Sequence, residues 1–168
     1  MTKEVKKRKY HVKRVNGHLH KVIPVLDSSG KIMQYALKPL MVELHLRDIM
    51  QIIVGSVILA IPVGMTEEVW HLGNEMKMLN FLFLTLLSLL FVAMFVYYNF
   101  YRHHLHEHRF DFIKRVIATY IISAIVVALF LTIIGKCPWG IDNIVAIKRI
   151  IIVAFPASMS ATLSDTIK

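Results

Sequence analysis

The sequence predicts an all-α polytopic membrane protein in which four transmembrane helices follow a small N-terminal antiparallel β-meander. Two observations lead to this prediction. Apolar residues make up 56% of the 168 residues, and the charged residues, only 18%, are concentrated between long uncharged stretches. The mean hydropathy is +0.57. A soluble domain of this length rarely carries so much apolar surface, and the low charge content excludes a disordered tail or a coiled coil.

Four stretches without a charged side chain supply the predicted spans. They cover residues 49–66, 78–101, 116–135 and 150–164 and contain 18, 24, 20 and 15 residues. About 20 helical residues cross a hydrocarbon core of about 30 Å. The fourth stretch crosses it only if its helix extends back through Lys148 and Arg149, so three spans and a re-entrant or surface segment are the alternative. The predicted spans are 45–66, 78–101, 114–135 and 143–164.

The distribution of basic residues predicts the orientation. Residues 1–48 contain 11 Lys or Arg against 4 acidic residues, and the segment 102–115 contains four basic residues, whereas 66–77 and 136–143 contain one each. The positive-inside rule then places both termini in the cytoplasm of a multi-pass protein of the cell inner (plasma) membrane. No apolar signal-peptide segment follows the basic start, so no cleavage is expected. The single cysteine, Cys137, has no intrachain disulfide partner.

Residues 1–39 are predicted to form a basic cytoplasmic meander, separate from a transmembrane domain at 40–168. The dipeptide Asn16-Gly17 is the strongest short hairpin signal, and a second turn at 27–30 precedes a third strand that ends at Pro39. Its basic residues favour an anionic lipid surface, although positive-inside anchoring together with solubility is the simpler and preferred explanation. Nucleic acid is not an expected partner, because the strands carry neither an aromatic platform nor a recognition helix.

Small residues at a spacing of four predict which helices pack closely in the bilayer. The first span carries Ser56, Ala60 and Gly64 on one stripe, and the fourth has similar residues around Pro156, whereas the second is bulky on every side. We expect the first and fourth spans to approach other backbones, and the second to face lipid. A homo-oligomer is favoured over an isolated bundle.

The end of the first span is the main candidate for an ion pathway. Pro62 frees a backbone carbonyl, and the carbonyls that are freed where a helix is broken often bind ions or substrates. Thr66, Glu67 and Glu68 follow at the external mouth, and in a symmetric oligomer the two carboxylates would form a cation-selecting ring. Trp70 would fix its depth at the interface. A plain kink and a solvated acidic loop are the competing interpretations.

Lys148 and Arg149 are unusual because they lie inside the fourth predicted span, about 9–10 Å along the helix from Asp142. A charge at that depth needs a partner or access to water. Glu67 or Glu68 is the natural partner, and snorkelling to the interface is the alternative. The candidate pathway residues are Pro62, Thr66, Glu67, Glu68, Trp70, Lys148, Arg149 and Pro156.

Four histidines, His103, His104, His106 and His108, lie between the second and third spans. They suggest a pH sensor or, through the pair at spacing four, a metal site, and a hydrated interfacial loop is the simplest alternative. No nucleophile with a base, phosphate-binding glycine loop or intramembrane acid pair is visible in the sequence. An enzyme is therefore not expected, and no cofactor is predicted.

The run Arg47-Asp48, the segment 55–62, and then Thr66-Glu-Glu68-Val-Trp70-His-Leu-Gly73 resemble a family of small uncharacterised prokaryotic integral membrane proteins. Pro156-Ala157-Ser158 is similar to the last span of that family. The resemblance covers residues 44–164, singles out Glu68 and Trp70, and implies a membrane protein without naming a substrate.

The resulting hypothesis is a homo-oligomeric channel or transporter for an inorganic cation with an acidic external mouth. The alternative is a non-conducting membrane scaffold or sensor whose basic sheet binds anionic lipid or a soluble partner.

Overall fold

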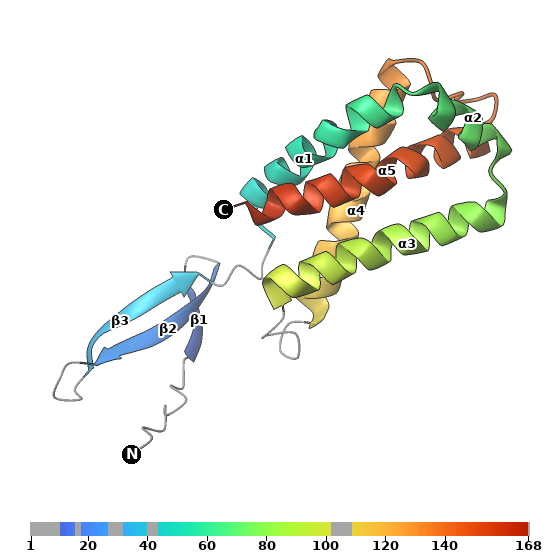
Figure 1. The fold of residues 1–168 in the computed structure, drawn as a ribbon. Helices are drawn as coiled ribbons and strands as arrows, with labels where there is room; N and C mark the ends of the chain where they lie inside the picture. Colours follow the sequence, from blue (N-terminus) through green and yellow to red (C-terminus); the bar gives the residue numbers. More distant parts are fainter. Residues whose placement is uncertain (1–10, 16–17, 27–31, 40–43, 102–108, 168) are drawn as a thin grey trace. The chain divides into compact units, whose positions relative to one another are not determined.

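The computed structural model describes residues 11–15, 18–26, 32–39, 44–101 and 109–167 (Figure 1). The chain divides into two compact units, residues 1–43 and residues 44–168. The first unit is a β-sheet and the second is a bundle of helices. The predicted fold class, four membrane-length helices after a small antiparallel sheet, is confirmed.

The first unit is a three-stranded antiparallel meander. Its strands are β1 (His11–Val15), β2 (His18–Leu26) and β3 (Ile32–Pro39), with β2 in the centre. The β1–β2 ladder ends on the pair Val15 and His18, which is the register that a two-residue turn at Asn16-Gly17 requires. Those two residues and the second predicted turn at 27–30 lie outside the described part of the chain.

Pro24 lies in the central strand, where a residue without an N–H group is normally disfavoured. The register explains why it is tolerated. β1 pairs only as far as His11 opposite Val22, so Pro24 lies past the described end of β1 and pairs with Tyr35 of β3. No pair of the described β1–β2 ladder involves Pro24, so its missing N–H removes none of those described bonds.

The second unit contains four helices that are long and apolar enough to cross a membrane. They are α1 (Leu46–Gly64), α3 (Met78–Val96) with the π-helical turn η1 (Tyr97–Tyr101), α4 (Arg109–Ile133) and α5 (Asn143–Thr166). The third helix begins five residues before its predicted start at 114, and the fourth ends two residues after its predicted end at 164. Lys148 and Arg149 lie within α5, so the fourth helix does reach membrane-spanning length.

A short helix, α2 (Glu67–Glu75), occupies part of the segment 66–77, which the sequence analysis treated as a loop. The first turn of α2 carries Glu67 and Glu68. Acidic side chains in a first turn are stabilised by the positive end of the helix dipole, so the same residues that suggested an ion mouth also favour a helix start.

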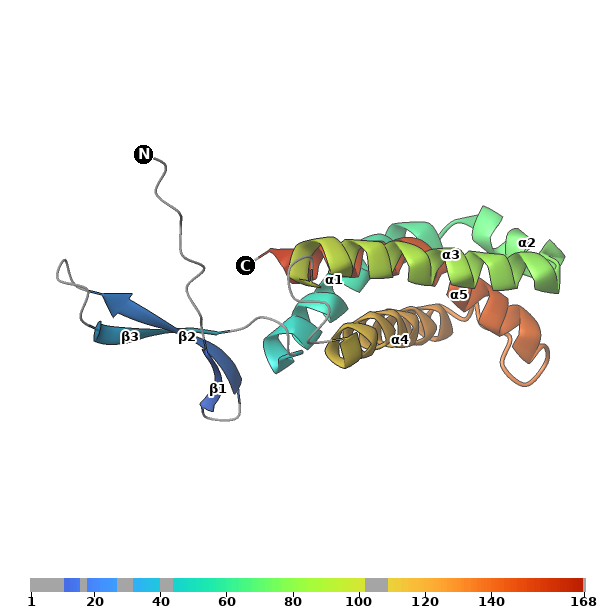
Figure 2. The same cartoon turned by 90° about the horizontal axis from the view of Figure 1, so that it is seen from below.

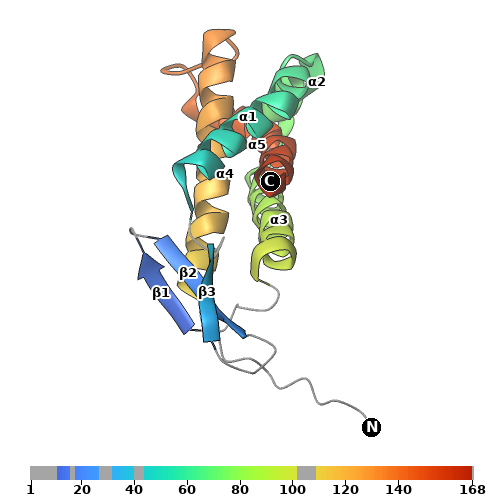
Figure 3. The ribbon, with the colours of Figure 1, turned by 90° about the vertical axis from the view of Figure 1, so that its left-hand side faces the viewer.

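Helix α5 is the centre of the bundle. It lies between α1 and α3 in Figure 1, and the views in Figures 2 and 3 show α4 packed beside it as well. Half of its most hydrophobic stretch, 50%, is buried, compared with 17% for the span that contains α3. The span that contains α3 is therefore the least buried of the four, as its bulky residues predicted.

Helices α1 and α4 run parallel and match residue for residue. Asp48 contacts Arg115, Ser56 contacts Ser123, and Gly64 lies against Leu131, each pair separated by 67 positions. The matched positions recur every eighth residue, that is, at every second position of a row of side chains spaced by four along the helix. This face therefore changes along its length from charged, through hydroxyl-bearing, to apolar.

Helix α5 runs antiparallel to α1, and the two backbones approach closely at Gly55. A Cβ atom on Gly55 would lie 2.8 Å from the Ala161 Cα and 2.9 Å from the Ser160 carbonyl oxygen. Such proximity needs small residues on both helices. The predicted close approach of the first and fourth spans is thus confirmed.

Candidate functional site

Three ionisable side chains meet inside the bundle at the end that holds the start of α1, which we call the Asp48 end. Arg115 Nη2 lies 3.2 Å from Asp48 Oδ2 and 2.6 Å from Asp165 Oδ2. Asp48, Arg115 and Asp165 come from α1, α4 and α5, and each side chain is 1% exposed. We call these three residues the charge cluster. Because each residue comes from a different helix, the cluster joins three spans.

The ends of two helices position the carboxylates. Asp48 lies in the first turn of α1, where its Oδ2 also accepts a hydrogen bond from the backbone N–H of His45 at 3.2 Å. Asp165 is the last residue but one of α5. Arg115 lies two turns into α4, and its guanidinium carbon is 3.9 Å from the centroid of the Phe100 ring. The cation therefore contacts an aromatic face as well as carboxylates.

The π-helical turn η1 explains why aromatic residues reach the cluster. Tyr97 and Tyr98 are 37% and 64% exposed, as expected for an interfacial belt, but Tyr101 is fully buried. Its ring packs edge-to-face on Phe112 of α4, with 5.3 Å between the ring centroids. Tyr101, at the end of η1, therefore lies on the inner face of the bundle, whereas Tyr97 and Tyr98 do not. Such π-turns are frequent at functional sites.

Hydroxyl groups lie next along the buried faces. The Ser56 and Ser123 hydroxyl oxygens are 2.9 Å apart, and those of Ser88 and Ser158 are 3.2 Å apart. Thr119 Oγ1 is also buried, with no hydrogen-bond partner among the described residues. Thr119 lies one helical turn from both Arg115 and Ser123. Polar side chains therefore recur in the bundle interior from the Asp48 end to the level of the serine pairs, among buried apolar residues such as Ile52, Val92 and Val96.

Beyond the serine pairs the interior is apolar. Ala60, Val127 and Leu131 belong to the same buried cluster as Ile150 and Val153 of α5. All five are at most 8% exposed. Their packing separates the polar interior from the opposite end of the bundle, which we call the Trp70 end.

At the Trp70 end, the two basic residues of α5, Lys148 and Arg149, bind backbone and amide oxygens. Lys148 Nζ donates to the Met76 carbonyl at 2.6 Å. Arg149 donates from Nη1 to the Lys136 carbonyl at 2.6 Å and from Nη2 to Asn74 Oδ1 at 3.2 Å. The two residues thus join α5 to the segment after α2 and to the segment after α4.

The predicted pairing of these cations with the glutamates does not occur. Glu67 and Glu68 are exposed, and neither makes an ion pair with Lys148 or Arg149 within the described residues. The reason is geometric, because α2 begins with the two glutamates and presents its opposite end to α5. At that end a Cβ atom on Gly73 would collide with the Arg149 side chain, so the glycine permits the contact.

Trp70 links the other parts of this end. Its indole Nε1 donates to the Gly64 carbonyl at 3.0 Å, and Lys136 Nζ lies 3.6 Å from the centroid of its ring. The indole therefore bonds a carbonyl near the C-terminus of α1 and binds a cation from the segment after α4. Trp70 is a packing residue of this end as well as a candidate for the interface.

The remaining predicted residues do not form one site. Pro62 is exposed on α1, and the Thr66 hydroxyl donates to the Val63 carbonyl at 2.7 Å. Pro156 is half-buried inside α5. The four histidines at 103, 104, 106 and 108 lie outside the described residues, and the described part of the chain holds no group of three or more potential metal ligands.

The charge cluster was missed by the sequence analysis. Each of its members lies near the end of a span, where an ionisable residue is normally taken as interfacial. One signal was available, because each member is in line, at a spacing of four, with small or hydroxyl residues. Arg115 precedes Thr119 and Ser123, and Asp165 follows Ala157 and Ala161. Asp48 is in line with Ser56, Ala60 and Gly64, although Ile52 comes between. An ionisable residue in line with a packing stripe faces protein rather than water.

The fold and its buried charges define a polytopic integral membrane protein. The chain belongs to the family described as "Putative integral membrane protein (DUF2391)", whose model matches residues 27–164. The match includes the four membrane-length helices and part of the sheet. No curated protein and no solved structure matches the chain.

Proposed function

We propose that the protein transports an inorganic cation across the membrane and that the charge cluster binds the cation in transit. The charge cluster carries this proposal, because ionised side chains inside a membrane domain are costly and usually serve a pathway. Asp48 and Asp165 place carboxylate oxygens beside one guanidinium, each side chain only 1% exposed. Carboxylate and hydroxyl oxygens are the ligands that hard cations prefer.

Cation binding at this cluster would be coupled to helix movement. A cation that reaches the carboxylates competes with Arg115 for the same oxygens, and those contacts join α1, α4 and α5. The apolar packing of Val127, Leu131 and Val153 favours a transporter that changes conformation over a permanently open channel. The cluster and the Trp70 end would then be exposed in turn.

The predicted orientation is consistent with this proposal. With both termini in the cytoplasm, the charge cluster lies buried near the cytoplasmic end of the bundle, and Glu67 and Glu68 attract cations on the outside. A homo-oligomer would gather these glutamates into a ring, whereas the polar interior of the single bundle allows a path through each chain. The path through an oligomer and the path through a single bundle would carry the same cation, and both would use the charge cluster and the two glutamates.

Ion flux into vesicles that contain the purified protein tests the proposal. We expect flux of at least one cation among H⁺, Na⁺ and K⁺, with Asp48→Asn and Asp165→Asn each abolishing it. Glu75→Gln, which removes an exposed carboxylate of α2, is the matched control and should retain flux. Asp48→Glu keeps the charge and should retain part of the activity, which separates loss of the carboxylate from loss of folding.

The double variant Glu67→Gln, Glu68→Gln should lower the flux without abolishing it, since these residues would concentrate the cation rather than bind it inside the bundle. An absence of flux for every cation tested would contradict the proposal. It would favour the non-conducting scaffold or sensor, for which binding of the N-terminal sheet to anionic vesicles is the activity to measure.

A further inference from the structure

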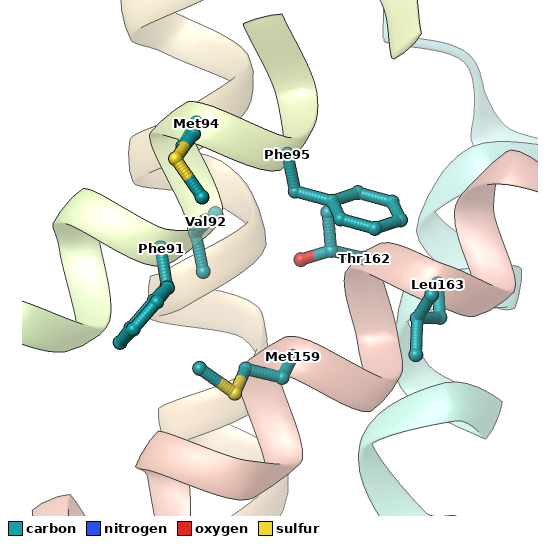
Figure 4. A pocket seen from close by; sticks show the side chains of 7 residues that line it. All are labelled: Phe91, Val92, Met94, Phe95, Met159, Thr162 and Leu163. Carbon is teal, nitrogen blue, oxygen red and sulfur yellow. The ribbon is translucent and has the colours of Figure 1, made fainter. Parts of the chain in front are cut away.

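An apolar groove lies between α3 and α5, in the half of the bundle that contains the Asp48 end. Its volume is about 190 Å³. Phe91 and Phe95 of α3 and Met159 and Leu163 of α5 form its walls (Figure 4). Val92 and Thr162 lie deeper; both are 1% exposed, whereas Leu163 at the rim is 52% exposed. The groove is therefore open on one side and closed by the packed bundle on the other.

The groove offers an occupant no polar group to bind. Thr162 supplies the one hydroxyl among the described lining residues, and that hydroxyl already donates to the Ser158 carbonyl at 2.6 Å. An apolar cavity of about 150 Å³ stays free of water and accepts a hydrocarbon of benzene size. An occupant of this groove must accordingly be hydrocarbon, and several methylene groups fill it.

The position of the groove indicates which hydrocarbon is available to occupy it. Both helices have membrane-spanning length, so the open side faces lipid. Tyr98, which is 64% exposed, is expected at the level of the lipid headgroups. At a rise of about 1.5 Å per residue, Phe95 and Phe91 lie about 4–10 Å deeper than Tyr98, where the first half of an acyl chain runs.

A second copy of the chain is a poorer occupant. Helices pack closely in membranes through small residues, which let backbones approach. The groove walls are phenylalanine, methionine and leucine, and the neighbouring exposed residues of α3, such as Leu86 and Leu90, are also bulky. A flexible acyl chain adapts to such a surface, whereas a helix does not.

We propose that this groove binds one acyl chain of a membrane phospholipid, independently of whether the protein transports a cation. The acyl chain would lie against Thr162 and Leu163, which are within one helical turn of Asp165 on α5. A bound chain would therefore brace the turn of α5 that carries a member of the charge cluster.

Photo-crosslinking tests the proposal on the full-length protein in phosphatidylcholine vesicles. The probe is phosphatidylcholine with a diazirine in the upper half of one acyl chain, and adducts are located by peptide mass spectrometry. We expect several-fold more adducts on Met94 and Met159 than on the exposed face of α4 around Ile121 and Ile125.

Met159→Trp fills the groove and should reduce the α3–α5 adducts to the level of α4. Leu163→Phe, at the rim, should act in the same direction if the first variant folds poorly. Leu86→Trp enlarges a residue of α3 that is 62% exposed and outside the groove, and it should leave the adducts unchanged. Equal labelling of all exposed faces, or crosslinks at Met94 mainly to a second protein chain, would overturn the proposal.

Discussion

Arg115 donates two hydrogen bonds to one carboxylate oxygen of Asp165, from Nε at 3.1 Å and from Nη2 at 2.6 Å. The residues are 50 positions apart and belong to α4 and α5, and both side chains are buried. The same guanidinium also reaches Asp48 of α1. The folding of three spans against one another therefore depends on a contact that no single helix can make.

Replacing Asp165 by Ala should destabilise the protein strongly. The change removes a partner of a buried guanidinium, and breaking a buried pair in this way costs about 3–5 kcal/mol. We expect a marked fall of the thermal unfolding midpoint in detergent. Glu75→Ala, which removes an exposed carboxylate, is the control. Similar small shifts for the two variants would show that Asp165 contributes little to folding.

Replacing Gly55 by Ala should separate α1 from α5. The new Cβ would lie 2.5 Å from Ser164 Cβ and 2.8 Å from Ala161 Cα, so the helix backbones must move apart. Overpacking of this kind costs about 1–3 kcal/mol. The thermal unfolding midpoint measures the loss. Val54→Ala changes the neighbouring residue, which is 56% exposed, and should have little effect. An unchanged midpoint for Gly55→Ala would contradict the close packing.

The two basic residues of α5 should matter more for stability than the two glutamates of α2. Lys148→Met and Arg149→Met remove donors to the carbonyls of Met76 and Lys136, and each charge-assisted hydrogen bond contributes about 1.5–3 kcal/mol. Glu67→Gln and Glu68→Gln should lower the unfolding midpoint much less, because each removes only the interaction of an exposed carboxylate with the helix dipole. If instead the glutamate variants lower it as much as the α5 variants, the glutamates are the real partners of Lys148 and Arg149.

Cys137 should react slowly with maleimide reagents, and its reaction rate should increase as the pH rises. Burial raises the pKa of the Cys137 thiol, while the Thr132 hydroxyl and the charge of Arg149 partly oppose that rise. The reactive thiolate is therefore scarce at neutral pH, and its fraction grows about tenfold per pH unit below the pKa. Labelling rates between pH 7 and pH 9 in roughly unit steps test this expectation.

The control for Cys137 is a cysteine at position 139 in a Cys137→Ser background, obtained by Trp139→Cys, because residue 139 is 46% exposed. The cysteine at position 139 should react faster than Cys137 at every pH. As the pH rises, its rate should also reach a plateau at a lower pH than the rate of Cys137. Equal rates and equal pH profiles for the two cysteines would show that burial does not control the Cys137 thiol.

Much of the secondary structure was predictable because it depends on local composition. Long apolar stretches without charge become helices in a bilayer, since every backbone group must be bonded within its own segment. The Asn16-Gly17 signal likewise predicted the register in which β1 and β2 pair. Helix α2 was missed because its nine residues show no long apolar stretch, and its acidic first turn had a competing interpretation as an ion mouth.

The candidate sites were harder to predict because they depend on contacts between distant segments. The acids and bases at the Trp70 end were expected to pair by charge. Instead, Lys148 and Arg149 bind the Met76 and Lys136 carbonyls, which follow the ends of α2 and α4, and Arg149 also binds the side-chain oxygen of Asn74. No sequence rule distinguishes such a carbonyl from a carboxylate as the partner of a cation.

The sequence alone determined that the chain crosses a membrane and which spans carry small residues for packing, because hydropathy and residue size act within each segment. The structure was needed to show that the fourth helix runs through Lys148 and Arg149 and reaches membrane-spanning length. Only the tertiary structure decided that Asp48, Arg115 and Asp165 meet, because that depends on the parallel match of α1 with α4 and on the antiparallel contact of both with α5. The depth at which one helix settles against another is set by packing along their whole length, and a single segment does not contain that information.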